Sequence, residues 1–450
     1  MKILLFNPPR YNNTPVARIF RAEYLLNYCV APPMDLAYFS AFIKKINDEV
    51  EIQILDANGE NLNHEEALKR IIRFSPDVII TKGVLNILEH DLIVPKLYKT
   101  LNPNVKIFLN SRTAIGFEDF ILKKFPFIDG ILTGELDAYA HYFSKENLTD
   151  IKKLNKSLKN IKKPLILTFL DDNPLPDIDA LPNIWYGGYY GHPYTKSGYF
   201  LVGGRGCVFK CSYCPTGGII NSPFFYRVKS IENVILEIKE IKERNIDDFF
   251  IFDEISTIPR RAELISKAII KEKLDVTWGC EGMVKFVNRK MLYWMKKAGC
   301  RCIYYGIETA DEKSLKMVNK PQTYQDMVRA IKLTKKMGIK VGLYLMLGLP
   351  SQSWYSFFKT LKLILSTNPD AFGVSILSPY PGTTLYKVMV YKSLINNSET
   401  TNLYDRHISK FTDSIPIKTE KLKPTEIKLQ EIILKMFNYL KNRSHIKFFV

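Results

Sequence analysis

The sequence predicts an α/β protein with an N-terminal doubly wound parallel sheet, a partial (β/α)6 barrel and a small helical C-terminal tail. Strand-like apolar runs alternate with amphipathic stretches over residues 1–150, and the same alternation returns over residues 199–390. A helical apolar repeat follows within residues 391–450. The chain of 450 residues is long enough for two or three hydrophobic cores. We therefore expect three structural parts, with a linker at residues 151–198.

The first 150 residues predict a parallel sheet whose ligands bind over the carboxyl ends of its strands. Strands that alternate with helices need crossover connections, and such sheets place their binding crevice at that edge. The expected strands cover residues 2–6, 51–55, 77–81, 105–109 and 128–132, and the expected helices cover residues 36–47, 65–74, 92–101 and 117–125.

Residues 151–198 are typical of a linker. Their first part is rich in lysine, and residues 171–182 are rich in aspartate and proline. The following segment predicts the barrel, in which chemistry takes place at the carboxyl ends of the strands. Its expected strands cover residues 199–202, 248–252, 276–279, 302–307, 340–346 and 371–376, and its expected helices cover residues 231–243, 261–272, 289–298, 324–337 and 355–366.

Three of the seven cysteines follow the first barrel strand with the spacing C-x3-C-x2-C, at Cys207, Cys211 and Cys214. Thiolates hold iron–sulfur clusters, so we expect these residues to bind three irons of a four-iron–four-sulfur (4Fe-4S) cluster. Because no fourth cysteine lies nearby, one iron is left for an external ligand. The alternatives are a zinc site or inert thiols, although zinc sites favour C-x2-C pairs with a second pair or histidines.

The motif C-x3-C-x-aromatic-C, with Tyr213 as the aromatic residue, resembles the signature of the radical S-adenosylmethionine (radical SAM) superfamily. The resemblance implies that SAM binds the open iron and is cleaved reductively to a 5′-deoxyadenosyl radical. It also implies that a reductase with flavodoxin, or a ferredoxin, donates the electron. The cysteines would then be catalytic residues as well as metal ligands.

Further elements of the same resemblance lie at the ends of later barrel strands. Gly306-Ile307-Glu308-Thr309 is similar to the family element whose acid contacts SAM, and Gly348-Leu349-Pro350 is similar to the element after the fifth strand. Pro379-Tyr380-Pro381 is similar to a turn that lines the substrate side. The resemblance therefore implies cofactor-binding roles for Tyr213, Glu308, Gly348 and Pro379. The sequence departs from the subfamily at Cys280-Glu281-Gly282-Met283, where an arginine is common.

The N-terminal part resembles the Rossmann-like cobalamin-binding domain that precedes the barrel in one radical SAM subfamily. The resemblance rests on Phe6-Asn7-Pro8-Pro9, on the segment that begins at Ala31-Pro32-Pro33, and on Gly134-Glu135. The D-x-H-x-x-G motif that supplies a histidine to cobalt is absent, as is the Gly-Gly turn, which is replaced by Asn110-Ser111. The resemblance implies cobalamin held by backbone and shape; the alternative is a βα domain that binds no cofactor.

The remaining cysteines predict structural roles. Cys280, Cys300 and Cys302 match no ligand spacing, and buried cysteines are common in cores. Cys29 stands alone in the N-terminal part, which argues against a second cluster there. Cysteines without a paired framework indicate a reducing cytoplasm.

The C-terminal helix carries an apolar stripe that we expect to dock on the core. Leu429, Ile432, Ile433, Met436, Phe437 and Leu440 share one helical face. The alternative is a basic amphipathic helix that lies on a membrane surface, which would suit a lipid substrate. We therefore expect a cytoplasmic protein, with peripheral membrane contact through this helix as the alternative.

The net charge of +18 invites a nucleic-acid interpretation. The basic residues are spread widely, however, so we expect a solvated basic surface and no nucleic-acid partner. The function predicted by the resemblance is methylation of an unactivated carbon in a small molecule or lipid, with the 5′-deoxyadenosyl radical and methylcobalamin. A radical SAM cyclase that forms a carbon–carbon bond is the alternative, and a non-catalytic Fe–S or nucleic-acid-binding protein is a third possibility.

Overall fold

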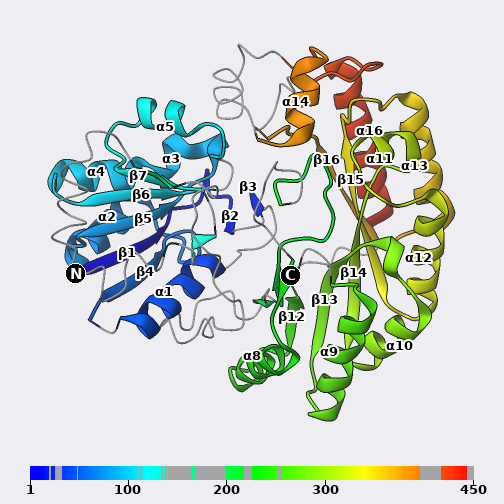
Figure 1. Ribbon diagram of the computed structural model, residues 1–450, viewed down its shortest axis with the longest axis horizontal. Coiled ribbons are helices and arrows are strands. Elements are labelled where there is room, and N and C mark those ends of the chain that lie inside the picture. Colours follow the sequence, from blue (N-terminus) through cyan, green and yellow to red (C-terminus); the bar gives the residue numbers. More distant parts are fainter. Residues whose placement is uncertain are drawn as a thin grey trace. The chain divides into compact units, whose positions relative to one another are not determined.

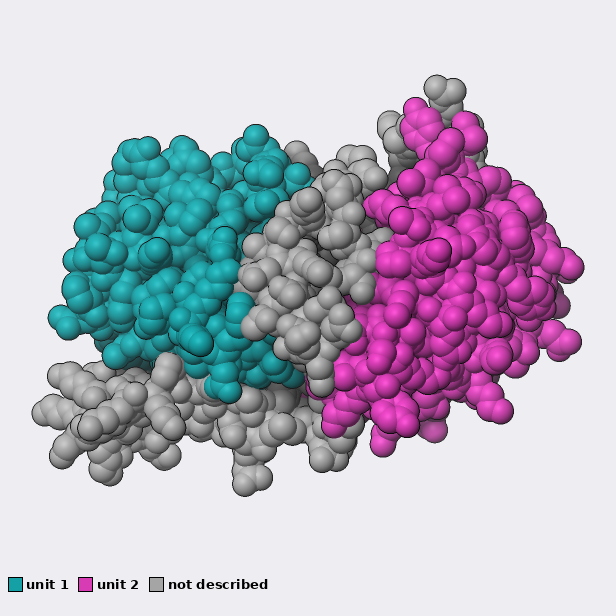
Figure 2. Space-filling view, turned by 90° about the horizontal axis from the view of Figure 1, so that it is seen from above, with its two compact units in different colours: residues 1–198, 400–411, 449–450 teal, residues 199–399, 412–448 magenta. Residues whose placement is uncertain are grey.

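Two parallel six-stranded sheets form the framework of the protein (Figure 1). Contacts divide the chain into unit 1, which comprises Met1–Gly198, Thr400–Phe411 and Phe449–Val450, and unit 2, which comprises Tyr199–Glu399 and Thr412–Phe448 (Figure 2). The computed structural model describes residues 1–19, 22–25, 33–47, 49–111, 114–133, 135–136, 139, 165–167, 199–201, 203–216, 226–251, 253, 256–380, 382–395 and 417–442.

The sheet of unit 1 has the strand order β4-β1-β5-β6-β7-β8, and all neighbouring strands are parallel. The first strand in sequence thus lies between the second and third of this sheet, which places the topological switch point between β1 and β5. This confirms the predicted doubly wound sheet. The strands are β1 (Lys2–Asn7), β4 (Glu51–Asp56), β5 (Val78–Lys82), β6 (Lys106–Asn110), β7 (Gly130–Leu132) and β8 (Leu165–Leu167).

Helices cover both faces of this sheet because successive β1 side chains point to opposite faces. Ile3 and Leu5 pack with Phe39 of α1 in one core, whereas Leu4 and Phe6 pack in a second core with residues of α2 and α4. The helices are α1 (Met34–Ile46), α2 (His64–Phe74), α3 (Leu88–Asp91), α4 (Ile93–Leu101) and α5 (Glu118–Lys124).

Two features of unit 1 were not predicted. β2 (Val16–Ile19) and β3 (Ala22–Leu25) form an antiparallel hairpin, although residues 20–21 are Phe-Arg, without the Gly or Asn that marks most tight hairpin turns. β8 lies inside the segment that we expected to be a linker and pairs with β7. The remainder of that segment, including the aromatic stretch at residues 185–194, lies outside the described residues. The predicted division into domains stays a prediction.

The sheet of unit 2 follows chain order, β16-β15-β14-β13-β12-β9, with every neighbouring pair parallel. β9 and β16 are its two edges, so the described strands form an open, partial barrel, as predicted. The strands are β9 (Tyr199–Leu201), β12 (Asp248–Ile251), β13 (Thr277–Gly282), β14 (Cys300–Glu308), β15 (Lys340–Leu347) and β16 (Ala371–Ile376).

Helices pack on the outer face of this sheet (Figure 1). Leu345 and Leu347 of β15 face α13 and α16, whereas the Tyr344 hydroxyl, from the opposite face, donates to Glu281 Oε1 at 3.2 Å. The helices are α8 (Ile231–Glu243), α9 (Pro259–Lys271), α10 (Arg289–Lys297), α11 (Glu312–Met317), α12 (Tyr324–Lys336), α13 (Trp354–Thr367), α14 (Thr384–Tyr391) and α16 (Pro424–Asn442).

The prediction of which face of the C-terminal helix packs on the core is wrong. α16 packs on β15 and β16 through buried Ile427, Gln430 and Leu434. Leu429, Ile432, Met436 and Leu440 of the predicted stripe are exposed, and only Ile433 and Phe437 are partly buried. On the side that packs inward, the Asn438 side chain donates to the Phe372 carbonyl at 2.8 Å. None of the described helices has the length and hydrophobicity needed to cross a bilayer.

Candidate active site

The three predicted cluster cysteines lie on one loop that follows β9. β10 (Gly204–Arg205) pairs with β11 (Arg227–Val228) and closes the start of this loop. Gly206 then adopts a left-handed conformation with φ of 78°, which a glycine adopts without strain. Cys207 and Cys214 are partly exposed, Cys211 is buried, and all three thiols are free.

Backbone amides point at two of the thiols. The Phe209 N–H donates to Cys207 Sγ at 3.4 Å, and the Thr216 N–H donates to Cys214 Sγ at 3.4 Å. Hydrogen bonds of this kind stabilise thiolates and tune iron–sulfur clusters. Among the described residues, no three His, Cys, Asp or Glu side chains converge on a single metal ion. A cubane places each thiolate on its own iron, so the loop fits a 4Fe-4S cluster better than a zinc ion.

The cysteine loop is held by segments that follow two later strands. The Ser212 N–H donates to the Val318 carbonyl, and the Leu385 N–H donates to the Ser212 carbonyl, both at 2.9 Å. The Asn319 side chain donates to the Lys210 carbonyl at 2.9 Å. The chain after β14 and the start of α14 therefore fix the position of the cysteines.

Glu308 ends β14 in an unusual backbone conformation. Its φ is 61°, and the pairing of β14 with β15 shifts register at this point. A left-handed conformation is uncommon for a residue other than glycine and is typical of functional sites. The conformation turns the carboxylate toward the cysteine loop, where the Tyr213 hydroxyl donates to Glu308 Oε1 at 3.0 Å. The structure thus brings together two residues that the sequence predicted separately.

Lys320 completes this arrangement and was not predicted. Its Nζ lies 2.6 Å from Glu308 Oε1 and 3.2 Å from the Tyr213 hydroxyl oxygen. In the sequence, Lys320 follows a short helix and resembles one of many surface lysines. The available signal was its position: it lies in the connection after β14, and such connections form the active face of a barrel.

Burial and charge decide the protonation of this group. Burial raises the pKa of the Tyr213 hydroxyl well above its ordinary value, and the nearby Glu308 carboxylate raises it further. Burial alone would lower the pKa of Lys320, but Glu308 and Cys211 outweigh that effect and raise it. Burial also raises the pKa of Cys211 to about 11, although Lys320 opposes this shift. Tyr213 is therefore a neutral donor, and Lys320 is a buried cation beside the cysteine loop.

Three further residues at the ends of barrel strands lie around this centre or apart from it. Asp253 follows β12 and lies against Gly203, where an added Cβ would be 3.0 Å from Asp253 Oδ2. Pro379 is buried in the connection from β16 to α14. Gly348 has φ of 88°, and an added Cβ there would lie 2.6 Å from Ile417, so its surroundings are apolar packing. The predicted cofactor-binding roles of Gly348 and Pro379 stay predictions.

The three later cysteines are buried in the barrel. Cys280, Cys300 and Cys302 are at most 3% exposed. Burial raises the pKa of Cys302 to about 12 and that of Cys280 well above its ordinary value. The thiols of Cys280 and Cys302 therefore stay protonated, and the burial of all three cysteines agrees with the predicted structural role. Cys29 lies outside the described residues.

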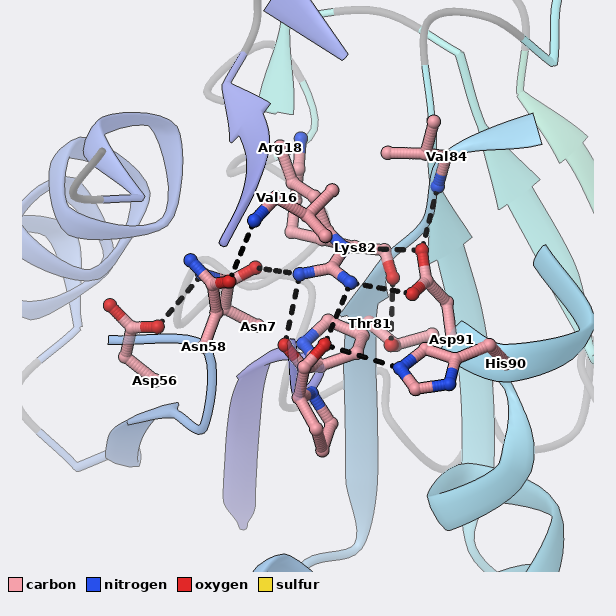
Figure 3. Close-up of polar contacts among 12 residues, drawn as sticks. Asn7, Val16, Arg18, Asp56, Asn58, Thr81, Lys82, Val84, His90 and Asp91 are labelled. Atoms are coloured by element: carbon pink, nitrogen blue, oxygen red, sulfur yellow. Dashed lines mark hydrogen bonds and ion pairs between the residues drawn. The ribbon is translucent and has the colours of Figure 1, made fainter. Parts of the chain in front are cut away.

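A second polar centre lies at the carboxyl edge of the sheet of unit 1 (Figure 3). Arg18, from the unpredicted hairpin, has a fully buried side chain that forms an ion pair with Asp91 at 2.6 Å. Its guanidinium also donates to the carbonyls of Pro8 and Pro9, at 2.9 and 3.0 Å. The Asn7 amide donates to Asp56 at 2.8 Å. These contacts join the ends of β1 and β4 to the hairpin.

The charges at this edge are cancelled in pairs. Lys82, at the end of β5, is buried against Asp35 and donates to Asn110 Oδ1 at 2.7 Å. His90 Nε2 lies 3.3 Å from the Pro9 carbonyl oxygen, and burial lowers the pKa of this imidazole. His64 packs edge-on against His90, with ring centroids 4.6 Å apart. The edge is therefore a polar floor beside the switch point of the sheet, and its Arg18 and Lys82 cations are each paired with an acid.

This floor fits cobalamin held by backbone and shape. A large planar ligand can rest on paired polar groups without transferring an unbalanced charge out of water. Among the described residues of unit 1, His90 Nε2 lies against the Pro9 carbonyl, whereas His64 Nε2 is buried without a hydrogen-bond partner. Several residues that carried the resemblance, including Ala31, Pro32 and Gly134, lie outside the described residues.

Residues 201–364 match the family model described as the Radical SAM superfamily. The matched range contains the cysteine loop, Glu308 and Lys320. This segment therefore carries a radical SAM domain. The match also agrees with the position of the site, because it covers β9 to β15 and the connections at their carboxyl ends.

Curated proteins that are similar to this chain include methyltransferases and a cyclase. It is 26% identical to an uncharacterized methyltransferase of Pyrococcus horikoshii over 88% of this chain and 84% of the relative. It is 25% identical to the anaerobic magnesium-protoporphyrin IX monomethyl ester cyclase of Rubrivivax gelatinosus over 79% of this chain and 66% of the relative. The chain thus spans slightly less than two thirds of that cyclase.

Solved structures share the fold over most of this chain. The methyltransferase TsrM of Kitasatospora setae, with tryptophan and a SAM analog bound, has a TM-score of 0.62, 12% identity, and coverage of 87% of this chain and 76% of TsrM. The cobalamin-dependent radical enzyme OxsB, with aqua-cobalamin and SAM bound, has a TM-score of 0.64, 15% identity, and coverage of 97% of this chain and 61% of OxsB. At these identities the likeness concerns architecture.

Proposed function

We propose that this protein is a cobalamin-dependent radical SAM enzyme that methylates an unactivated carbon of a small molecule. The observation that carries the proposal is the buried Glu308–Lys320 pair beside the three-cysteine loop. Superfamily members act on small molecules with electrons from an external donor. The relatives and the OxsB-like architecture support the choice of cobalamin and of methyl transfer.

Each residue of the site has a task in this proposal. Cys207, Cys211 and Cys214 hold the cluster, which when bound supplies the electron that cleaves SAM. Glu308 and Lys320 present a negative and a positive group side by side, which matches the amino and carboxylate groups of SAM. Tyr213 orients the carboxylate by donating to Glu308 Oε1. The left-handed backbone at Glu308 keeps this acid aimed at the cysteine loop.

The carboxyl edge of unit 1 would hold the second cofactor. Asn7, Arg18, Lys82 and Asn110 form its floor, and their charges are already balanced by Asp35 and Asp91. Cobalamin, when bound, supplies the methyl group. The protein's contribution is to orient the reactants and to exclude water from them.

Product analysis separates methyl transfer from the alternative, a cyclase that forms a carbon–carbon bond. Anaerobically reconstituted enzyme with SAM and a reductant should form S-adenosylhomocysteine together with 5′-deoxyadenosine, because one SAM remakes the methyl donor and another makes the radical. A cyclase would form 5′-deoxyadenosine alone. Iron, sulfide and corrin should be quantified on the same sample, since absence of corrin would overturn the cobalamin part and leave a plain radical SAM enzyme.

The predicted membrane contact belongs to the same proposal. A lipid or lipid-like substrate would reach an enzyme that binds the bilayer surface reversibly through its C-terminal helix. The exposed apolar residues of α16 support this contact. The nucleic-acid alternative has no support from the described contacts.

A further inference from the structure

Large apolar side chains are exposed along one side of α16. Leu429, Ile432, Met436 and Leu440 are 48%, 43%, 59% and 63% exposed. Their spacing of three or four residues places them on one stripe of the helix. From the first to the last, the stripe extends about 16 Å at 1.5 Å per residue. Tyr439, which is 61% exposed, lies at its margin.

α13 carries a second exposed apolar stripe. Tyr355, Phe358 and Leu365 are 69%, 58% and 60% exposed, and their spacing also places them on one side of their helix. Soluble proteins expose single apolar residues routinely, whereas a contiguous group indicates an interaction surface.

The two helices lie side by side on the same face of the sheet. The Trp354 indole donates to Glu426 Oε1 at 2.9 Å and joins the first turns of α13 and α16. Residues of both helices line one small cavity above β15, including Phe357 of α13 and Leu434 of α16. Because both helices turn their buried faces toward β15, both turn their exposed stripes away from the sheet. We name these stripes together the α13–α16 surface.

The charges around the α13–α16 surface are predominantly positive. α13 contains Lys359 and Lys362 and no acidic residue. On α16, Glu431 is nine-tenths buried and pairs with both Lys428 and Lys435, so two cations share one anion. The Glu426 carboxylate accepts hydrogen bonds from Trp354 and from the Lys423 backbone. The apolar stripes are thus flanked by cations with few competing anions.

We propose that the α13–α16 surface binds anionic lipid bilayers. Amphipathic helices with apolar stripes and flanking lysines lie in the membrane interface, and cations near an anionic surface add to the attraction. Tyrosines such as Tyr355 and Tyr439 favour the same interface. This inference extends the proposed membrane contact and does not depend on the proposed chemistry.

Vesicle flotation tests the inference on the full chain reconstituted under anaerobic conditions. Vesicles of phosphatidylcholine with phosphatidylglycerol should carry the protein upward, whereas vesicles of phosphatidylcholine alone should carry much less. Raising the salt concentration should release the protein, because salt screens the lysines. Equal binding to both vesicle types, or binding to neither, would overturn the proposal. Since flotation does not measure turnover, its outcome is independent of the proposed reaction.

Double substitutions show whether the α13–α16 surface is the part of the protein that binds the vesicles. Ile432→Ser with Met436→Ser should weaken vesicle binding about tenfold, because two side chains lose most of their transfer energy. The matched control is Leu97→Ser with Leu101→Ser on α4, two side chains that are 46% and 63% exposed. Lys359→Gln with Lys362→Gln should reduce the preference for anionic vesicles. If the α16 variant instead separates a dimer and leaves vesicle binding unchanged, the surface is a contact between copies and the proposal is wrong.

Discussion

Lys320 Nζ lies 2.6 Å from Glu308 Oε1, and both side chains are nearly buried, at 8% and 11% exposure. The pair joins the end of β14, which contains Glu308, to the segment after α11, which contains Lys320. Its position beside Cys211 makes it part of the cysteine loop's environment, as the influence of Lys320 on the Cys211 pKa shows. We therefore expect the pair to affect folding and, in the proposed function, SAM binding.

Breaking this pair from one side should destabilise unit 2. Glu308→Gln leaves the Lys320 ammonium buried without its anion, and we expect a loss of about 3 kcal/mol in the free energy of unfolding. Glu308→Gln combined with Lys320→Met should lose less than Glu308→Gln alone. Urea unfolding of the single and double variants measures both values. Additive losses would show that the two residues do not act as a pair.

Lys320→Met should also weaken SAM binding to the reconstituted protein. The variant removes the positive group proposed to meet the SAM carboxylate, so we expect the dissociation constant to rise about tenfold or more. Equilibrium dialysis with labelled SAM measures it without turnover. The control is Lys316→Met, an exposed lysine on α11. If the Lys320 and Lys316 variants bound SAM with equal affinity, Lys320 would not be part of the SAM site.

The buried ion pair of unit 1 should matter far more than an exposed pair. Asp91→Asn leaves Arg18 buried with its charge uncompensated, and we expect unit 1 to lose about 3–5 kcal/mol. Lys69→Met, which breaks an exposed pair with Glu65, should leave stability unchanged within error. Denaturation curves recorded in parallel give the free energy of unfolding of each variant. An Asp91 variant as stable as the Lys69 variant would contradict the buried network.

Cys302 makes stability depend on pH in the alkaline range. Its pKa is about 12 in the folded protein, against an ordinary value of 9.0, because burial disfavours the thiolate. The folded state therefore keeps a proton that the unfolded state releases. This contribution is complete below pH 9.0 and is lost as the pH rises toward 12. Urea midpoints between pH 8 and 11 should fall less steeply in Cys302→Ala than in the natural chain.

The sequence predicted the framework well because periodicity records which faces are buried. Residues 231–243 and 371–376 coincide with α8 and β16, and the three cysteines were recognised from their spacing. The hairpin β2–β3 escaped prediction because its turn has no glycine or asparagine. Lys320 escaped because a single lysine shows its burial only after folding. The exposed stripe of α16 was assigned to the core because periodicity identifies an apolar face but not its partner.

The central claim is that the cysteine loop binds a 4Fe-4S cluster. Iron analysis of Cys211→Ala tests this claim most directly. Anaerobically reconstituted natural protein should hold about four irons and four sulfides per chain and should cleave SAM when reduced. The variant should lose most of the cluster absorbance and all reductive cleavage, while its circular dichroism stays unchanged. A Cys211→Ala protein with full cluster absorbance and undiminished 5′-deoxyadenosine formation would contradict the account.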